Sequence, residues 1–114
     1  MNPTTNGPRF LAYDRAREAL RMLRAPLARI RGANRSLADQ LTRAASSVLL
    51  NLGEGAERRG ADRLHLYRVA AGSAAEVRSA LEAAEALGFV EASEIAAVWD
   101  RFDHVVRILR LITR

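Results

Sequence analysis

Asn51-Leu52-Gly53-Glu54-Gly55 interrupts one apolar helical pattern, and Gly72-Ser73-Ala74-Ala75-Glu76-Val77 interrupts the next. Glycines and carboxylates are disfavoured inside an apolar helix unless a close contact or a buried polar link requires them. Asn51 continues the apolar stripe of its segment, and Glu54 follows it by almost one turn. We therefore predict a buried polar lock that fixes the register of two facing helices. Its residues are Asn51, Glu54, Gly55, Gly72, Ser73 and Glu76, with Arg58 and Arg59 as further partners.

Apolar residues recur at steps of three and four along four segments, the spacing that keeps side chains on one face of a helix. The series are Tyr13, Ala16, Leu20, Leu23, Leu27 and Ile30; Leu37, Leu41, Ala44, Val48 and Asn51; Tyr67, Ala70, Ala74, Val77, Leu81 and Ala84; and Ile95, Val98, Phe102, Val105, Leu109 and Ile112. No segment alternates with period two, so no strand is expected. The pattern predicts an all-α protein: an up-down-up-down antiparallel four-helix bundle over residues 10–114, after a disordered tail over residues 1–9.

Turn and capping residues mark the expected helix ends. Gly60 separates the second helix from the third, Gly88 is placed for a left-handed C-cap, and Glu91 or Ser93 opens the last helix. Ser36 followed by Asp39 resembles a capping box at the start of the second helix. Pro26 removes a backbone donor within the first segment, where the continuing pattern favours a kink over a break.

The charges of the 114-residue chain are unevenly distributed. All 18 basic residues are arginine, and residues 1–60 hold eleven of them against five acidic residues, whereas residues 61–114 hold seven against eight. Guanidinium groups match phosphate oxygens, so this asymmetry favours a polyanionic partner such as RNA or DNA. The candidate contact residues are Arg15, Arg21, Arg24, Arg29, Arg31 and Arg35. A solvated helix face is the alternative interpretation.

The second helix is apolar or small on nearly every face between Ala44 and Gly53, which predicts that it is covered from more than one side. Trp99 and Val106 widen the apolar stripe of the last helix. Such surplus apolar surface marks an interface, so we predict a homo-oligomer with Leu49, Leu50, Trp99 and Val106 as interface candidates. The longest uncharged run has ten residues, too few for a membrane span. A soluble protein is therefore expected, and the absence of cysteine suits the cytoplasm.

No constellation for catalysis or for a cofactor is apparent. The two histidines, His65 and His104, lack the paired carboxylate motifs of a di-metal bundle. There is no thiol, no nucleophile elbow and no phosphate-binding glycine loop. Glu54 acting as a general acid–base remains an alternative to the polar lock, but it has no second catalytic group beside it. We expect no enzyme activity, no metal and no cofactor.

The motif residues also resemble a known family. Ser47, Asn51, Gly53-Glu54-Gly55, Arg58-Arg59 and then Ala70-x-Gly72-Ser73-x-x-Glu76-Val77 are similar to the hallmark of the small four-helix-bundle proteins encoded in 23S rRNA intervening sequences. The match is best over residues 36–89. Leu49, Gly53 and Arg63 depart from the proline, alanine and phenylalanine usual in that family.

The resemblance implies a homo-oligomeric ring of four-helix bundles, a pentamer, and kinship with the accessory variability determinant of diversity-generating retroelements. That relative binds nucleic acid and a reverse transcriptase, so the resemblance adds both as candidate partners. The combined expectation is a non-enzymatic nucleic-acid-binding accessory or scaffold. A protein–protein scaffold whose arginines are merely solvated is the alternative.

Overall fold

Each of the four apolar series becomes helical in the computed structural model, which describes residues 7–114. The five helices are α1 (Pro8–Met22), α2 (Arg24–Ala33), α3 (Arg35–Ala56), α4 (Gly60–Ala86) and α5 (Ala92–Ile112). Residues 7–114 contain no strand, so the all-α prediction is confirmed. The first helix begins at Pro8, inside the stretch 1–9 that was expected to be a tail. Residues 1–6 of that expected tail lie outside the described part.

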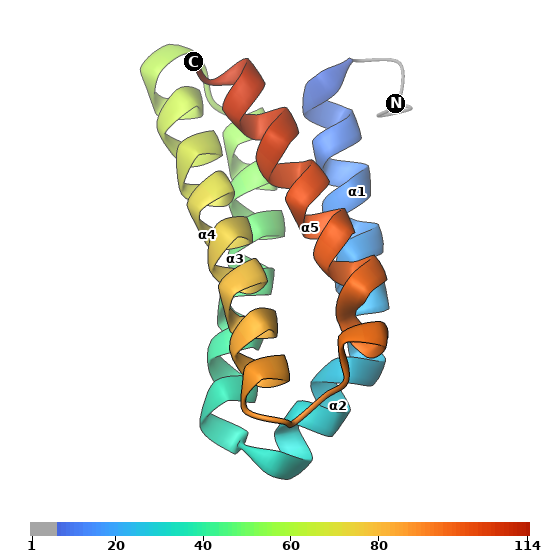
Figure 1. Ribbon diagram of the computed structural model, residues 1–114. Coiled ribbons are helices and arrows are strands. Elements are labelled where there is room, and N and C mark those ends of the chain that lie inside the picture. Colours follow the sequence, from blue (N-terminus) through green and yellow to red (C-terminus); the bar gives the residue numbers. More distant parts are fainter. Residues whose placement is uncertain (1–6) are drawn as a thin grey trace.

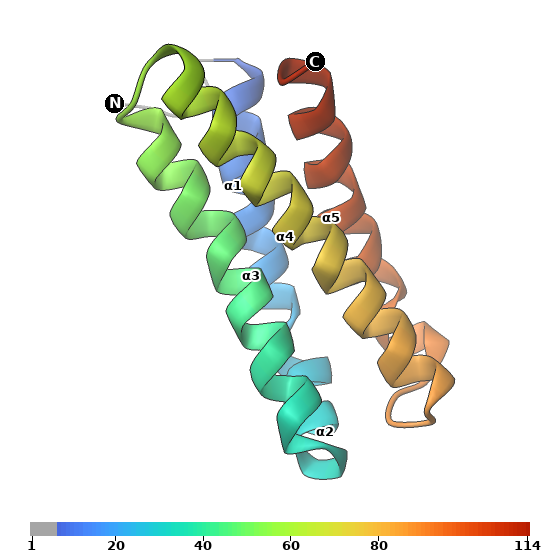
Figure 2. The same cartoon turned by 90° about the vertical axis from the view of Figure 1, so that its left-hand side faces the viewer.

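The five helices pack into a rod that measures 42 × 22 × 22 Å, an arrangement compatible with a helix bundle. Figure 2 shows α3 and α4 in front, with α1 and α5 behind them. Both described chain ends and the α3–α4 connection lie at one end of the rod, while the α2–α3 and α4–α5 connections lie at the other (Figure 1). The two ends of the rod therefore differ in the connections and chain ends that form them.

Pro26 divides the first segment into two helices, but it barely interrupts the helical path. The backbone N–H of Leu23 donates to the Ala19 carbonyl at 2.9 Å, and Leu27 donates to Leu23 at 2.9 Å. Leu23 itself keeps right-handed helical dihedral angles. The helix ends at Met22 and resumes at Arg24, because the proline nitrogen cannot donate to the preceding turn.

Alanine is the most frequent residue type in the buried core. Of the predicted stripe on α4, every residue is buried, and on α5 all are buried except the half-buried Ile112. On α1 the buried residues include Ala12 and Ala19, which the predicted series missed, while Tyr13 and Leu20 are only partly buried. Small alanine side chains allow close helix approach, and the sequence pattern underestimates them because alanine is only weakly apolar.

The helix caps explain why the connections are short. Asn34 is the N-cap of α3, and its side-chain oxygen accepts from the Leu37 N–H at 2.9 Å. The Ser36/Asp39 capping box predicted there is therefore wrong by two residues. Gly88 has φ +80° and ends α4, and Phe89 donates to the Ala84 carbonyl at 2.9 Å, as in a Schellman motif. Glu91 precedes α5, and its N–H donates to the Glu94 carboxylate at 2.8 Å.

Candidate nucleic-acid interface

The polar link between α3 and α4 is made by serines. The hydroxyl groups of Ser47 and Ser73 are 2.8 Å apart, and the Asn51 amide donates to the Ser47 carbonyl at 2.8 Å and to its hydroxyl at 3.0 Å. Asn51 is half-buried. The asparagine thus orients a serine that bridges the two helices, so a polar link between α3 and α4 exists. Ser47 belongs to this link, although it was predicted only as part of the family motif.

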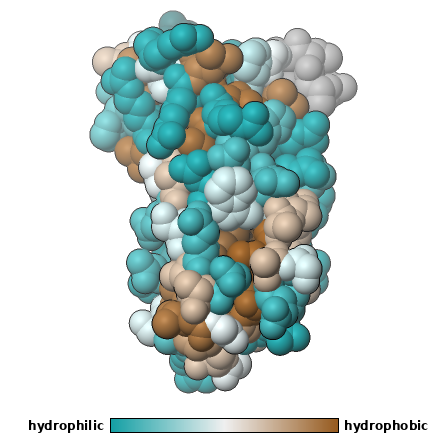
Figure 3. Space-filling model, viewed as in Figure 1, coloured by the Kyte–Doolittle hydropathy of each residue, from teal (hydrophilic) through white to brown (hydrophobic). Residues whose placement is uncertain are grey.

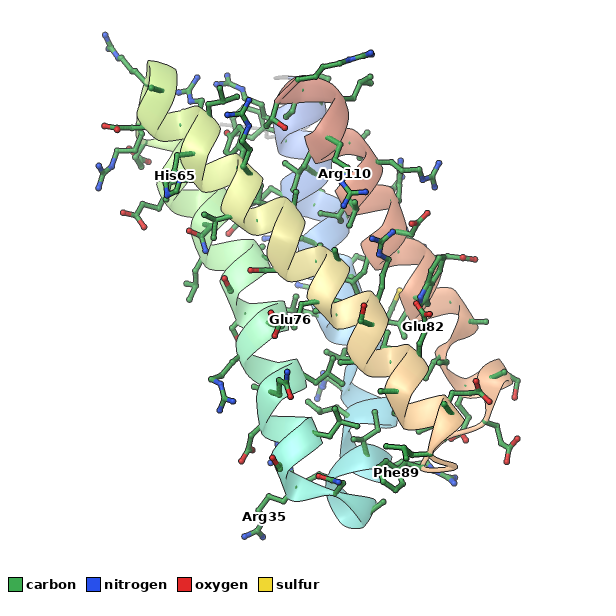
Figure 4. All side chains as sticks on the ribbon, turned by 60° about the vertical axis from the view of Figure 1, so that its left-hand side comes forward. Arg35, His65, Glu76, Glu82, Phe89 and Arg110 are labelled. Atoms are coloured by element: carbon green, nitrogen blue, oxygen red, sulfur yellow. The ribbon has the colours of Figure 1, made fainter. Side chains whose placement is uncertain are left out.

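The two glutamates of the predicted lock take no part in this link. Glu54 is exposed and pairs with Arg58 one turn later on the same helix, at 3.0 Å. Glu76 is exposed on α4, midway along the rod (Figure 4). The prediction that these carboxylates are buried between the helices is therefore wrong: the buried stripe of α3 continues through Leu52 and Gly55, and Glu54 lies beside it on the exposed face.

Gly55 is required for the close approach of α3 and α4. A Cβ atom at this position would lie 2.6 Å from Cε1 and 2.8 Å from Cδ1 of the Tyr67 ring. Gly53 and Gly72 have no such restriction, since a Cβ at Gly53 would meet Tyr13 at an ordinary 3.8 Å and one at Gly72 would meet nothing within 4 Å. The expected tight contact therefore exists at one glycine of the motif, Gly55.

Arg63, which departs from the family pattern, closes the end of α3. Its Nε donates to the Gly55 carbonyl at 3.1 Å, and an Nη donates to the Ala56 carbonyl at 3.2 Å. These are carbonyls of the last helical turn, which lack partners within the helix. A guanidinium therefore satisfies the helix end in place of an apolar contact.

The predicted interface residues are not equally available. Leu50 is 70% exposed on α3, and Leu49 is half-buried against the core. Trp99 is also half-buried, and its ring N–H donates to Glu82 at 2.9 Å while the Arg78 guanidinium lies 5.9 Å from the ring centre. Val106 is 1% exposed, so the structure contradicts its assignment to an interface. It faces inward because the buried face of α5 is wider than the predicted stripe.

Three of the six arginine candidates are engaged by carboxylates. Arg15 pairs with Glu18 at 3.1 Å, Arg29 with Glu94 at 3.2 Å and Arg31 with Asp39 at 2.7 Å. The hydrogen bond from Arg31 lowers the pKa of Asp39 below its ordinary value. The other three candidates, Arg21, Arg24 and Arg35, are exposed and make no ion pair within residues 7–114.

Folding redistributes the charge that the sequence halves suggested. The end of the rod formed by residues 7–12, 54–69 and 104–114 is called the basic end below (Figure 1). Its charged residues are eight arginines, Arg9, Arg58, Arg59, Arg63, Arg68, Arg107, Arg110 and Arg114, against Glu54, Glu57 and Asp62. The opposite end, residues 19–46 and 80–98, holds six arginines against five acidic residues. The positive excess therefore lies at the basic end.

The opposite end is nearly neutral because α4 and α5 bring their glutamates there. Glu94 at the start of α5 reaches Arg29 of α2, a contact between segments distant in sequence. Figure 4 shows Arg35 and Phe89 together at this end, and Arg110 and His65 at the other. Figure 3 shows hydrophilic residues gathered over the part of α5 that reaches the basic end.

Several arginines of the basic end have structural partners. Arg58 pairs with Glu54, and Arg68 donates to the Thr113 carbonyl at 2.8 Å, which ties α4 to the end of α5. Arg59, Arg110 and Arg114 are exposed and have no carboxylate partner within residues 7–114. These three guanidinium groups keep all their donors available for an anion.

Two shallow hollows lie along the outer face of α5. The first, of about 400 Å³, is lined by Ala97, Asp100, Arg101, His104 and Arg107, and the second, of about 300 Å³, by Arg107, Arg110, Leu111 and Arg114. Partial burial lowers the pKa of His104, and the charges of Arg107, Arg15 and Arg101 add to this effect. The imidazole is therefore mainly neutral at pH 7.

No group that could hold a metal ion is formed among residues 7–114. His65 and His104 lie on different helices, and Glu54 is paired with Arg58 at an exposed site. Within the same residues, no helix is both long enough and apolar enough to cross a membrane.

Comparison with known proteins places the chain in a family. The profile of the 23S rRNA-intervening sequence proteins matches residues 12–111. The chain belongs to this family. Its motif residues Asn51, Gly55 and Ser73 are therefore the α3–α4 contact of a 23S rRNA-intervening sequence protein.

A solved structure is similar in fold to this member of the family. It is a protein of unknown function from the S23 ribosomal protein family of Bacteroides thetaiotaomicron, with 17% identity and a TM-score of 0.78, and the match covers 90% of this chain and 98% of the other. At this identity the likeness shows the fold alone. The comparison with curated proteins gave no match.

Proposed function

We propose that this 23S rRNA-intervening sequence protein is a non-enzymatic, cytoplasmic, oligomeric nucleic-acid-binding accessory that contacts RNA or DNA through its basic end. The observation that carries the proposal is the concentration of eight arginines against three acidic residues there. In this proposal the subunit is an up-down-up-down four-helix bundle in which α1 and α2 together form the first helix of the bundle. The family is named for intervening sequences of 23S rRNA, so RNA is one of the two nucleic acids that a binding experiment should include.

The physical basis is the match between guanidinium groups and phosphates. Each phosphate that an arginine neutralises releases condensed counterions, so binding is strong at low salt and does not depend on sequence. The exposed Arg59, Arg110 and Arg114 supply such contacts without first breaking an ion pair. Arg15, Arg29 and Arg31 would have to give up their carboxylate partners.

We expect the protein to be a homo-oligomer, a pentameric ring as the resemblance implies. Leu50 is 70% exposed in the C-terminal part of α3, and an apolar residue there would gain from cover by a second copy. Light scattering at micromolar concentration should give a mass several times the 12.5 kDa of one chain. A monomeric mass would contradict the interface and the ring together.

The binding proposal predicts a steep dependence on salt. A fluorescence-polarisation titration with labelled oligo(U) and oligo(dT) should show binding at low salt, with log K falling linearly against log salt by about 0.7 for each phosphate neutralised on a single strand. A ring would repeat the basic end in every subunit and raise the affinity through effective concentration.

Absence of binding at low salt would overturn this proposal and favour the alternative, a protein–protein scaffold with solvated arginines. The reverse transcriptase implied by the resemblance would then be the first candidate partner.

A further inference from the structure

The two hollows on α5 adjoin at Arg107, which lines both. They follow the outer face of the helix from Ala97 to Arg114, and the second hollow lies within the basic end. At 1.5 Å per residue, the stretch from His104 to Arg114 is about 15 Å long. This is long enough for several consecutive nucleotides of an extended strand.

Basic side chains, four arginines and one histidine, line the hollows at intervals of about one helical turn. They are Arg101, His104, Arg107, Arg110 and Arg114. Two nearby carboxylates are already neutralised: Asp103 accepts from Arg78 at 2.6 Å and from Arg107 at 3.0 Å, and Glu18 pairs with Arg15 and Arg101. Asp100 is exposed and has no ion-pair partner within residues 7–114. Its negative charge disfavours a phosphate in the first hollow, so the region that favours phosphate ends there.

An apolar side chain lies between the arginines of the second hollow. Leu111 is 58% exposed and is flanked by Arg107, Arg110 and Arg114. An exposed leucine among cations can contact the face of an unstacked base while the cations hold the phosphates. A duplex keeps its base faces stacked and therefore unavailable to Leu111, so the combination favours a single strand.

We infer that the outer face of α5 from His104 to Arg114 is a track for the sugar–phosphate backbone of single-stranded nucleic acid, with a base over Leu111 and a phosphate beside His104 and Arg107. The inference rests on the proposed function and assigns it to one helix face. RNA and DNA share this backbone chemistry, and the two oligonucleotides of the test distinguish them.

The phosphate beside His104 makes binding depend on pH. Arg15 of α1 and Arg101 and Arg107 of α5 disfavour the imidazolium in the free protein, Asp103 favours it, and Asp100 and the paired Glu18 are the other charges near the hollow. The negative charge of a bound phosphate reduces the net positive charge around His104, so the imidazolium is more stable in the complex. Proton uptake on binding means that affinity rises as pH falls from 7.5 to 6.

The decisive variants exchange matched leucines for a carboxylate. Leu111→Glu puts a negative charge inside the track, whereas Leu87→Glu puts the same charge on a leucine that is 63% exposed at the opposite end. Leu111→Glu should weaken oligo(U) and oligo(dT) binding on the order of tenfold at low salt, and Leu87→Glu much less. Circular dichroism and light scattering check that both variants keep the fold and the assembly of the wild type.

Three results would overturn the inference while the wild type still binds. They are equal losses in the two leucine variants, equal affinity for a duplex and a single strand of the same length, and an unchanged pH dependence in His104→Gln. The matched control for the histidine is His65→Gln, on α4. A wild type that binds no nucleic acid would instead refute the proposed function itself, so the two failures are distinguishable.

Discussion

Gly55→Ala should lower the free energy of unfolding by about 1–2 kcal/mol, although alanine is the better helix former. In an exposed helix the exchange would stabilise by roughly 1 kcal/mol. Here the new methyl group would lie 2.6 Å from a Tyr67 ring carbon, and that ring is 4% exposed and cannot move away. Inserting a methyl group into a closely packed site costs about 1–3 kcal/mol, and an overlap with two ring atoms belongs in the upper part of that range.

Gly72→Ala is the matched control, because within residues 7–114 no atom beyond its chain neighbours and its own helix backbone lies within 4 Å of the added methyl group. This variant should gain up to about 1 kcal/mol from helix propensity. Chemical denaturation of both variants measures the difference. If Gly55→Ala is as stable as the wild type, the close approach of α3 and α4 at Tyr67 is wrong.

Removing the unpaired arginines of the basic end should have the largest effect on nucleic-acid affinity. Arg59→Ser, Arg110→Ser and Arg114→Ser combined should weaken binding on the order of a hundredfold at low salt, from about 1 kcal/mol for each lost charge contact. The salt slope on a single strand should fall by about 2, because three phosphate contacts are lost.

The matched control removes the same charge from the opposite end. Arg21, Arg24 and Arg35 are also exposed and unpaired within residues 7–114, and changing all three to serine should leave the salt slope nearly unchanged. These three belong to the set predicted from the sequence alone. A larger effect in this variant would therefore restore that earlier prediction and contradict the assignment to the basic end.

Helix periods were predictable from the sequence because each segment carries a regular apolar stripe. Every residue of the α4 series and all but Ile112 of the α5 series are buried, although both buried faces are wider than the series. The α1 face was less accurate because Ala12 and Ala19 fill it, and alanine does not distinguish a buried position from a helical surface. The caps followed local chemistry at Gly88 and Glu91, whereas the N-cap of α3 is Asn34 and not the predicted Ser36.

The candidate site was harder to predict, because charge in a folded chain depends on which segments meet. The excess of arginine in residues 1–60 is real, but the end of α4, the α4–α5 connection and the start of α5 lie at the same end of the rod as α2 (Figure 1). These segments carry Glu82, Glu85, Glu91 and Glu94. The last turns of α5 lie in the sequence half that has no positive excess, yet they lie at the same end of the rod as the α3–α4 connection (Figure 1). A charge count made after pairing antiparallel segments, end by end, would have found the basic end.

The polar lock shows a similar limit. Helical spacing placed Glu54 one turn beyond Asn51, but it could not show that the buried stripe runs through Leu52 and Gly55, one residue away from the predicted series. The hydroxyl contact between Ser47 and Ser73 depends on the relative height of two helices. A single sequence does not encode that height as a pattern.

The most direct test of the central claim is an arginine footprint. Every basic residue is arginine, so one arginine-specific reagent with a mass-spectrometric readout reports on all of them in a single experiment with and without oligo(U). The account predicts that bound oligonucleotide protects Arg59, Arg110 and Arg114 and leaves Arg21, Arg24 and Arg35 reactive. Protection of the second set, with the first unchanged, would contradict it.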